Sequence, residues 1–114
     1  LAVLVNDLIE RGMYDDVMIV TTGEFGRTPQ KTPEGGDNHW PNSMSSLILG
    51  GEFQHGTRVG ETTLDTGKSI GKPITHMDIF ATIFKHFMIE NNLTIVSGDK
   101  RPFHILSSDA ASLL

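Results

Sequence analysis

The stretch "DDVMIVTTGEFGRTPQ", residues 15–30, decides how the rest of the sequence is interpreted. Its apolar run at residues 17–20 is continuous rather than alternating, which is typical of a strand covered on both faces, as in a parallel sheet. The run passes into a polar, glycine-containing loop that carries Glu24 and Arg27. In open α/β sheets, ligands collect beyond the carboxyl ends of the strands, so we expect these two side chains at a binding site.

Further elements are expected on both sides of this stretch. The apolar residues of segment 1–11 follow helical spacing, and Gly12 stands where a left-handed residue often ends a helix. A second strand is expected in "SMSSLILGG", residues 43–51, and an edge hairpin in "TRVGETT", residues 57–63. Between the two strands, residues 23–41 hold four Gly and three Pro without periodicity, and loops of that length are usually functional or disordered.

The most regular helical pattern lies in "KPITHMDIFATIFKHFMI", residues 72–89. Thr75 is suited to cap this helix and Asp78 to complete a variant of the capping box. The remaining sequence has mixed signals, with a short strand expected at 103–106. The order of elements predicts an α/β layered fold in a single domain that covers residues 1–114.

Composition excludes several classes of function. The 114 residues carry a formal net charge of −5 at pH 7, which gives no basic surface for nucleic acid. The apolar runs are too short to cross a bilayer. The sequence has no cysteine, so a bound metal would need His, Asp or Glu ligands.

Glu24 and Arg27 suit the chemistry of an anionic substrate. Glu24 offers a hard oxygen ligand or a base, and the forked guanidinium of Arg27 matches a phosphate or sulfate oxyanion. The alternative is a solvated ion pair between the two side chains, three residues apart on a tight turn, which would contribute little.

A second cluster lies in "GGDNHWP", residues 35–41, where Asp37 and His39 precede or adjoin the single tryptophan, Trp40. Histidine is a common metal ligand, and a neighbouring carboxylate can orient or join it. The alternative is an exposed or hydrogen-bonded histidine in a polar loop. Trp40 is expected either to pack over this loop or to stack on a substrate ring.

The other histidines are weaker candidates, because none has the spacing of a zinc motif. His76 is expected in the first turn of the second helix, where it can neighbour the cap or face a cleft. The others are His55, His86 and His104.

The order of these motifs resembles the bacterial uncharacterised family DUF1501, which is related to sulfatases and the alkaline phosphatase superfamily. The resemblance rests on "GEFGRTP", "GGDNHWP", "LGG", "RVGETT", "GKPITHMDIFATIFKHF" and "RPFHIL", and covers nearly the whole chain. It implies that the chain is the C-terminal part of a longer protein. Such parents often begin with a twin-arginine signal, which implies export to the periplasm.

The resemblance also implies a doubly wound α/β sheet with flanking helices and a two-metal site that hydrolyses phosphate or sulfate esters. Glu24 and His39 stand where metal ligands are expected, Asp37 lies one place before the usual acidic neighbour, and Arg27 would lie near the substrate oxyanion. Phe25 stands where a further ligand histidine is expected. The metal would be zinc, calcium, magnesium or manganese.

The nucleophile and several metal carboxylates of that superfamily come from the N-terminal half, so the chain alone is expected to be inactive. The alternative is a sulfatase-like protein without catalysis that binds or scaffolds anionic glycans. The expected partners are therefore a small-molecule or glycan ester and the rest of the parent. Self-association through an exposed sheet edge is also expected.

Overall fold

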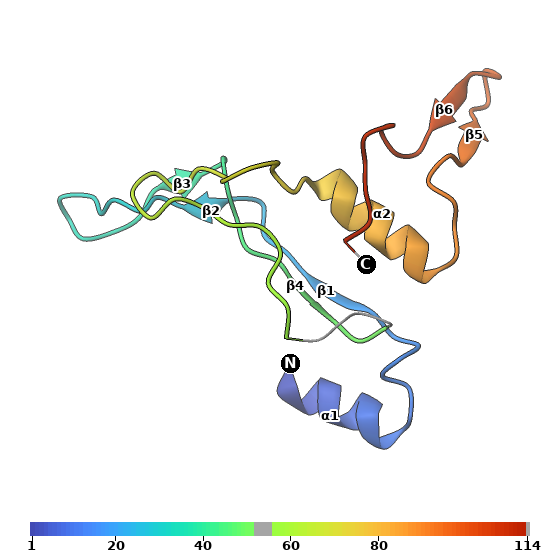
Figure 1. Cartoon of the computed structure of the whole chain (residues 1–114), viewed down its shortest axis with the longest axis horizontal. Helices are drawn as coiled ribbons and strands as arrows, with labels where there is room; N and C mark the ends of the chain where they lie inside the picture. The colour runs from blue at the N-terminus through green and yellow to red at the C-terminus, as the bar shows by residue number, and fades with distance from the viewer. Residues whose placement is uncertain (52–55, 114) are drawn as a thin grey trace.

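The computed structural model describes residues 1–51 and 56–113, so His55 lies outside the described residues. The order of elements is α1 (Ala2–Glu10), β1 (Ile19–Thr21), β2 (Gly26–Arg27), β3 (His39–Trp40), β4 (Leu47–Leu49), α2 (His76–His86), β5 (Thr94–Val96) and β6 (Pro102–His104) (Figure 1). The fold of this part is a mixture of helices and short antiparallel two-stranded sheets.

The end of α1 agrees with the glycine signal in the sequence. Gly12 has a φ of 66°, and its N–H donates to the carbonyl of Ile9 at 3.0 Å. The N–H of Met13 donates to the carbonyl of Leu8 at 2.8 Å. These two bonds form the Schellman arrangement, which satisfies carbonyls that the end of the helix leaves open.

The chain from β1 to β4 forms one long, irregular ribbon. β1 pairs antiparallel with β4, and farther along the ribbon β2 pairs antiparallel with β3. The expectation of a parallel sheet is therefore wrong for these strands. A parallel return needs a crossover connection, usually a helix, whereas the chain between β1 and β4 folds back on itself to form β2 and β3. A continuous apolar run indicates burial, but it does not specify the direction of the neighbouring strand.

The helix expected after Thr75 is present as α2, and its capping box is complete. The Thr75 side chain accepts from the N–H of Asp78, and the Asp78 carboxylate accepts from the N–H of Thr75 at 2.7 Å. Asp78 also accepts from the N–H of Ala111 at 2.9 Å, and the Thr82 hydroxyl accepts from the N–H of Leu113 at 2.9 Å. Polar side chains of α2 thus hold the C-terminal segment against the helix.

Two hairpins complete the described chain. The strand expected at 103–106 is present as β6, which pairs antiparallel with β5. The edge hairpin expected at residues 57–63 lies farther along the chain. Thr62 pairs with Ser69 in an antiparallel bridge, and the N–H of Ile70 donates to the carbonyl of Glu61.

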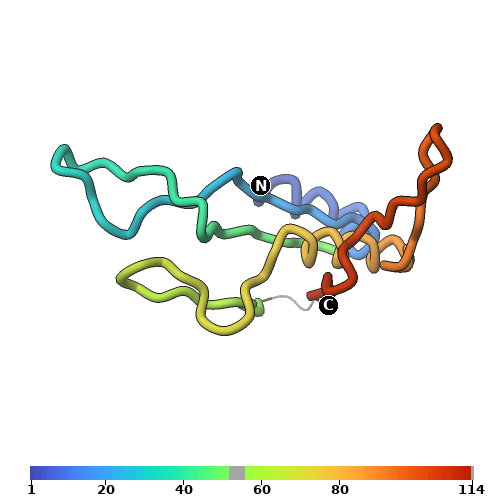
Figure 2. Tube along the Cα trace, turned by 90° about the horizontal axis from the view of Figure 1, so that it is seen from above, coloured from blue at the N-terminus to red at the C-terminus, as the bar shows by residue number. Residues whose placement is uncertain are grey.

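The arrangement of these elements is open. The β2–β3 end of the ribbon and the β5–β6 hairpin lie at opposite ends of the molecule in Figure 1, and Figure 2 shows the chain spread in a shallow layer. The radius of gyration is 17.5 Å, whereas a compact domain of this length would have about 13 Å. Among the described residues, the buried hydrophobic side chains are Leu8, Ala81 and Leu106. No helix in the described part is long and apolar enough to span a membrane.

Candidate functional site

The β2–β3 ladder brings together the two motifs that the sequence singled out. Arg27 lies opposite His39, and Gly26 lies opposite Trp40. The ladder continues with the N–H of Thr28, which donates to the carbonyl of Asn38 at 3.1 Å. Residues that are ten to fourteen apart in the sequence therefore share one small sheet.

Glycine at position 26 permits this approach. A Cβ atom added there would lie 1.9 Å from the carbonyl oxygen of Ser43. Because the contact is with backbone, a larger residue could enter only if the chain around Ser43 moved. The "GEFG" motif thus has a steric role besides any chemical one.

Three side chains stack at this ladder. The rings of Phe25 and His39 lie 3.8 Å apart between centroids with an interplanar angle of 23°. The guanidinium carbon of Arg27 lies 5.3 Å from the centroid of the Phe25 ring, which is within cation–π range. Phe25 therefore contacts both the guanidinium of Arg27 and the imidazole of His39. The side chains of Arg27 and His39 are exposed to solvent.

Asp37 has a partner that the sequence analysis did not identify. Its carboxylate oxygen lies 2.7 Å from the ammonium nitrogen of Lys31. Both residues belong to the loop between β2 and β3, so the ion pair closes the loop on itself. The spacing of six residues across two glycines and a proline gave no signal for this contact.

Trp40 packs beneath the turn of the hairpin at residues 62–69. The indole nitrogen is buried and has no acceptor among the described residues. A Cβ atom added to Gly67, which has a φ of 61°, would lie 3.2 Å from this nitrogen and 3.2 Å from the ring of Pro29. This contact agrees with the packing alternative for Trp40.

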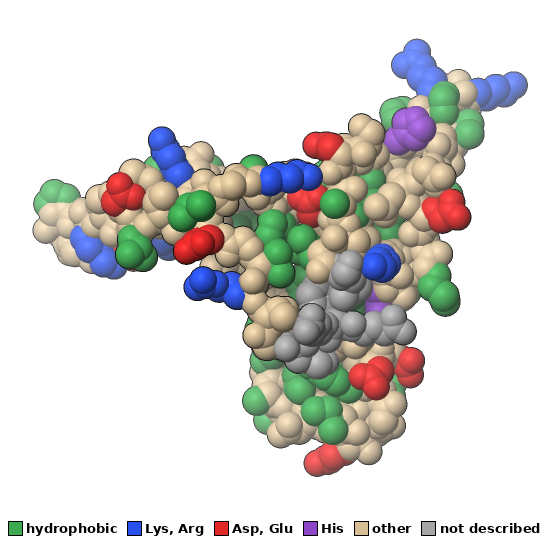
Figure 3. Space-filling view, in the orientation of Figure 1, with side chains coloured by type: hydrophobic (Ala, Val, Ile, Leu, Met, Phe, Trp, Pro, Cys, Tyr) green, Lys and Arg blue, Asp and Glu red, His purple; other side chains and the backbone are tan. Residues whose placement is uncertain are grey.

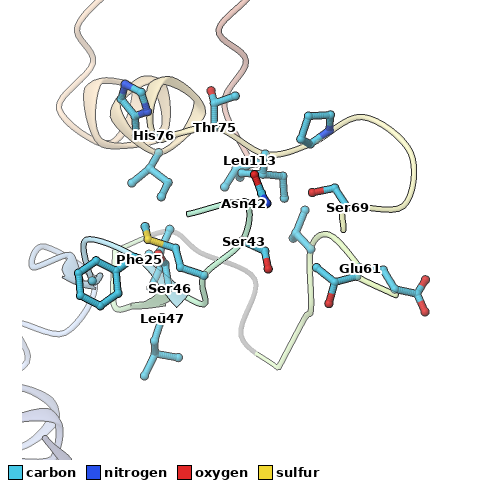
Figure 4. Close-up of a pocket in the computed structure, with 18 of the residues that line it drawn as sticks. Phe25, Asn42, Ser43, Ser46, Leu47, Glu61, Ser69, Thr75, His76 and Leu113 are labelled. Atoms are coloured by element: carbon cyan, nitrogen blue, oxygen red, sulfur yellow. The ribbon is translucent and has the colours of Figure 1, made fainter. Parts of the chain in front are cut away.

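A cavity of about 850 Å³ lies beside the ribbon (Figure 4). Glu24 and Phe25 line it, whereas Arg27, Asp37 and His39 are not among its lining residues. Other polar groups at its wall include Glu61 and His76, and the lining residues within the described ranges contain no Lys or Arg. His76 lines the cavity from the first turn of α2, directly after the N-cap residue Thr75. Glu61 was missed, because its place in the hairpin brings it to the cavity only through tertiary structure.

Asp78, a buried carboxylate in the first turn of α2, lies two residues after the cavity-lining His76. Hydrogen bonds from the N–H groups of Thr75 and Ala111 hold the pKa of its carboxyl group below the ordinary value, against the opposing effect of burial. The carboxylate accepts three hydrogen bonds, two from Thr75 and one from Ala111, which tie α2 to the C-terminal segment.

Among residues 1–51 and 56–113, no three His, Cys, Asp or Glu side chains form a cluster that could hold a metal ion. Within the described chain, Glu24 and His39 therefore belong to no cluster of three or more such side chains.

Comparison with known proteins adds one finding. The family described as "Protein of unknown function (DUF1501)" matches residues 1–113. No curated protein and no solved structure matches the chain significantly.

Proposed function

The chain belongs to the DUF1501 family, and from that premise we propose that it forms part of a metal-dependent phosphate or sulfate ester hydrolase. In this proposal Glu24 and His39 are metal ligands, and Arg27 binds the oxyanion of the ester. The nucleophile comes from polypeptide outside this chain, so the chain alone does not turn over substrate. The observation that carries the proposal is the pairing of Arg27 with His39 across the β2–β3 ladder.

Arg27 is suited to an oxyanion in two respects. Its guanidinium is permanently charged and presents donors in a planar fork, which matches two oxygens of a phosphate or sulfate group. The Phe25 ring beneath it limits its orientations at a modest energetic gain of about 0.5–1 kcal/mol for an exposed cation–π contact. The side chain is thus partly ordered before a ligand binds.

The metal in this proposal requires donors beyond the described residues. Glu24 would supply a carboxylate oxygen and His39 an imidazole nitrogen. Asp37 would have to leave Lys31 before it could join them. The missing donors, and the strands that would complete a doubly wound sheet beside β1, would come from the rest of the parent. A bound metal would polarise the ester and neutralise its oxyanion.

A second candidate function is the binding of anionic glycans without catalysis. It is favoured by Phe25, whose ring stacks on His39 at the position where the resemblance implies another ligand. The cavity next to Glu24 is also lined by many hydroxyl-bearing side chains, which suit a polyhydroxylated ligand.

Metal titration of the purified chain tests the ligand assignment. We expect Zn²⁺ or Mn²⁺ to bind in calorimetry, and Glu24→Gln or His39→Gln to weaken that binding at least about tenfold, or ~1.4 kcal/mol. The matched controls are Glu90→Gln and His104→Gln, which change the same residue types after α2 and in the β5–β6 hairpin. Equal metal binding by all four variants would remove Glu24 and His39 from the proposal.

The two functions are separated by activity of the complete parent protein loaded with the same metal. Hydrolysis of p-nitrophenyl phosphate or sulfate that is lost in Arg27→Lys would support the hydrolase, because lysine keeps the charge but not the fork. Binding of a sulfated oligosaccharide without any hydrolysis would support the second function instead.

A further inference from the structure

The β1–β4 ribbon has an edge that is suited to another strand. β4 pairs with β1 on one side, and no other described strand pairs with it. All three of its residues are apolar, and Leu47 is 45% exposed. The cavity of about 850 Å³ lies against β4, since Leu47, Ile48 and Leu49 all line it. Figure 3 shows hydrophobic side chains in the hollow between the β2–β3 arm and the part that carries α2.

This edge lacks the features by which proteins usually protect exposed strands. Natural edges carry charged side chains, prolines or bulges that discourage pairing. β2 and β3 carry Arg27 and His39, and β6 begins with Pro102 directly after Arg101. Residues 45–51, in contrast, contain neither a charge nor a proline. Among the described strands, β1 and β5 also contain neither a charge nor a proline. β4 differs from them because its residues line the cavity, which leaves space beside its free edge.

The chain exposes more surface to solvent than a compact monomer of its mass would. Its accessible surface measures 8607 Å², whereas a compact monomer of 12.5 kDa would expose about 6200 Å². The excess of roughly 2400 Å² exceeds the ~800 Å² per partner that a standard stable interface buries. This surface includes exposed apolar side chains, among them Leu47, Val59 and Ile74 around the cavity.

We propose that two copies of this chain pair through β4, antiparallel about a twofold axis at Ile48, and form a four-stranded sheet in the order β1–β4–β4′–β1′. In this arrangement Leu47 of one copy faces Leu49 of the other. The net charge of −5 on each chain opposes association in general, but the paired segment is uncharged, so no like charges meet at the axis. Such an interface is self-complementary, because each copy contributes the same residues.

Sedimentation of the purified chain tests the proposal. We expect a species of about 25 kDa, twice the 12.5 kDa of one chain, that Leu47→Lys converts to a monomer by placing a charge in the paired segment. Leu64→Lys is the control, because Leu64 is 98% exposed and lies outside β4. Circular dichroism would verify that both variants keep their secondary structure. A wild-type chain that stays monomeric at all concentrations overturns the proposal, as does an oligomer that Leu47→Lys leaves intact.

The twofold axis has its own test, because the chain has no cysteine. Ile48→Cys places one thiol in each copy at the axis, where directly opposite Cβ atoms lie about 4.5–5.5 Å apart. We expect oxidation to give a covalent dimer for Ile48→Cys and not for Leu64→Cys at the same dilute concentration. Cross-linking of both variants to the same extent, or of neither while the dimer persists, would exclude this arrangement.

Discussion

Gly26 is the residue at which the ladder is most sensitive to a small change. Gly26→Ala is expected to destabilise the chain by about 1–3 kcal/mol, because its Cβ would overlap the Ser43 carbonyl. Urea unfolding measures this loss. Gly36→Ala is the control, since a Cβ there would meet its nearest neighbour, the Thr32 hydroxyl, at an ordinary 3.5 Å. Equal stability of the two variants would mean that the segment around Ser43 moves freely.

At the scale of single elements, α2 and the C-terminal segment depend on Asp78. The pKa of Asp78 is lowered in the folded state from its usual 3.8. Its contribution is therefore fully present above about pH 4 and is lost as the pH falls through the lowered pKa. We expect Asp78→Asn to cost about 1–3 kcal/mol at pH 7 and to reduce the acid sensitivity of unfolding. The control is Asp99→Asn, an exposed change in the β5–β6 hairpin. It should leave the free energy of unfolding and its acid sensitivity unchanged.

At the scale of the whole molecule, the open shape links stability to association. If two chains bury apolar area that neither can bury alone, the folded state is stabilised by mass action. A tenfold rise in protein concentration should then raise the melting temperature by about 3–6 °C. Scanning calorimetry at several concentrations measures this shift. A melting temperature that does not depend on concentration would show that folding and pairing are independent.

Local signals in the sequence predicted the ends of the helices well. Gly12 ends α1 in the left-handed region, and Thr75 with Asp78 caps α2, because both signals act within one turn of the chain. The direction of β4 was not predictable in this way. It depends on how the 25 residues between β1 and β4 bring the two strands together. The periodicity of apolar residues within one strand carries no information about the direction of its neighbour.

The sequence selected the candidate residues but did not predict their arrangement in space. Residue chemistry selected Glu24, Arg27 and His39, but spacing alone did not show that Arg27 and His39 would be cross-strand neighbours. It also gave no sign that Lys31 would engage Asp37, because that contact depends on how the loop between β2 and β3 closes.

The packing of Trp40 beneath Gly67 has a practical consequence. The chain contains one tryptophan, and its indole lies where the ribbon meets the hairpin at residues 62–69. With excitation selective for tryptophan, which leaves Tyr14 dark, the fluorescence therefore originates from that junction. Emission would shift to longer wavelength as water reaches the ring, so an unmodified sample carries an optical reporter of the contact between two distant parts of its chain.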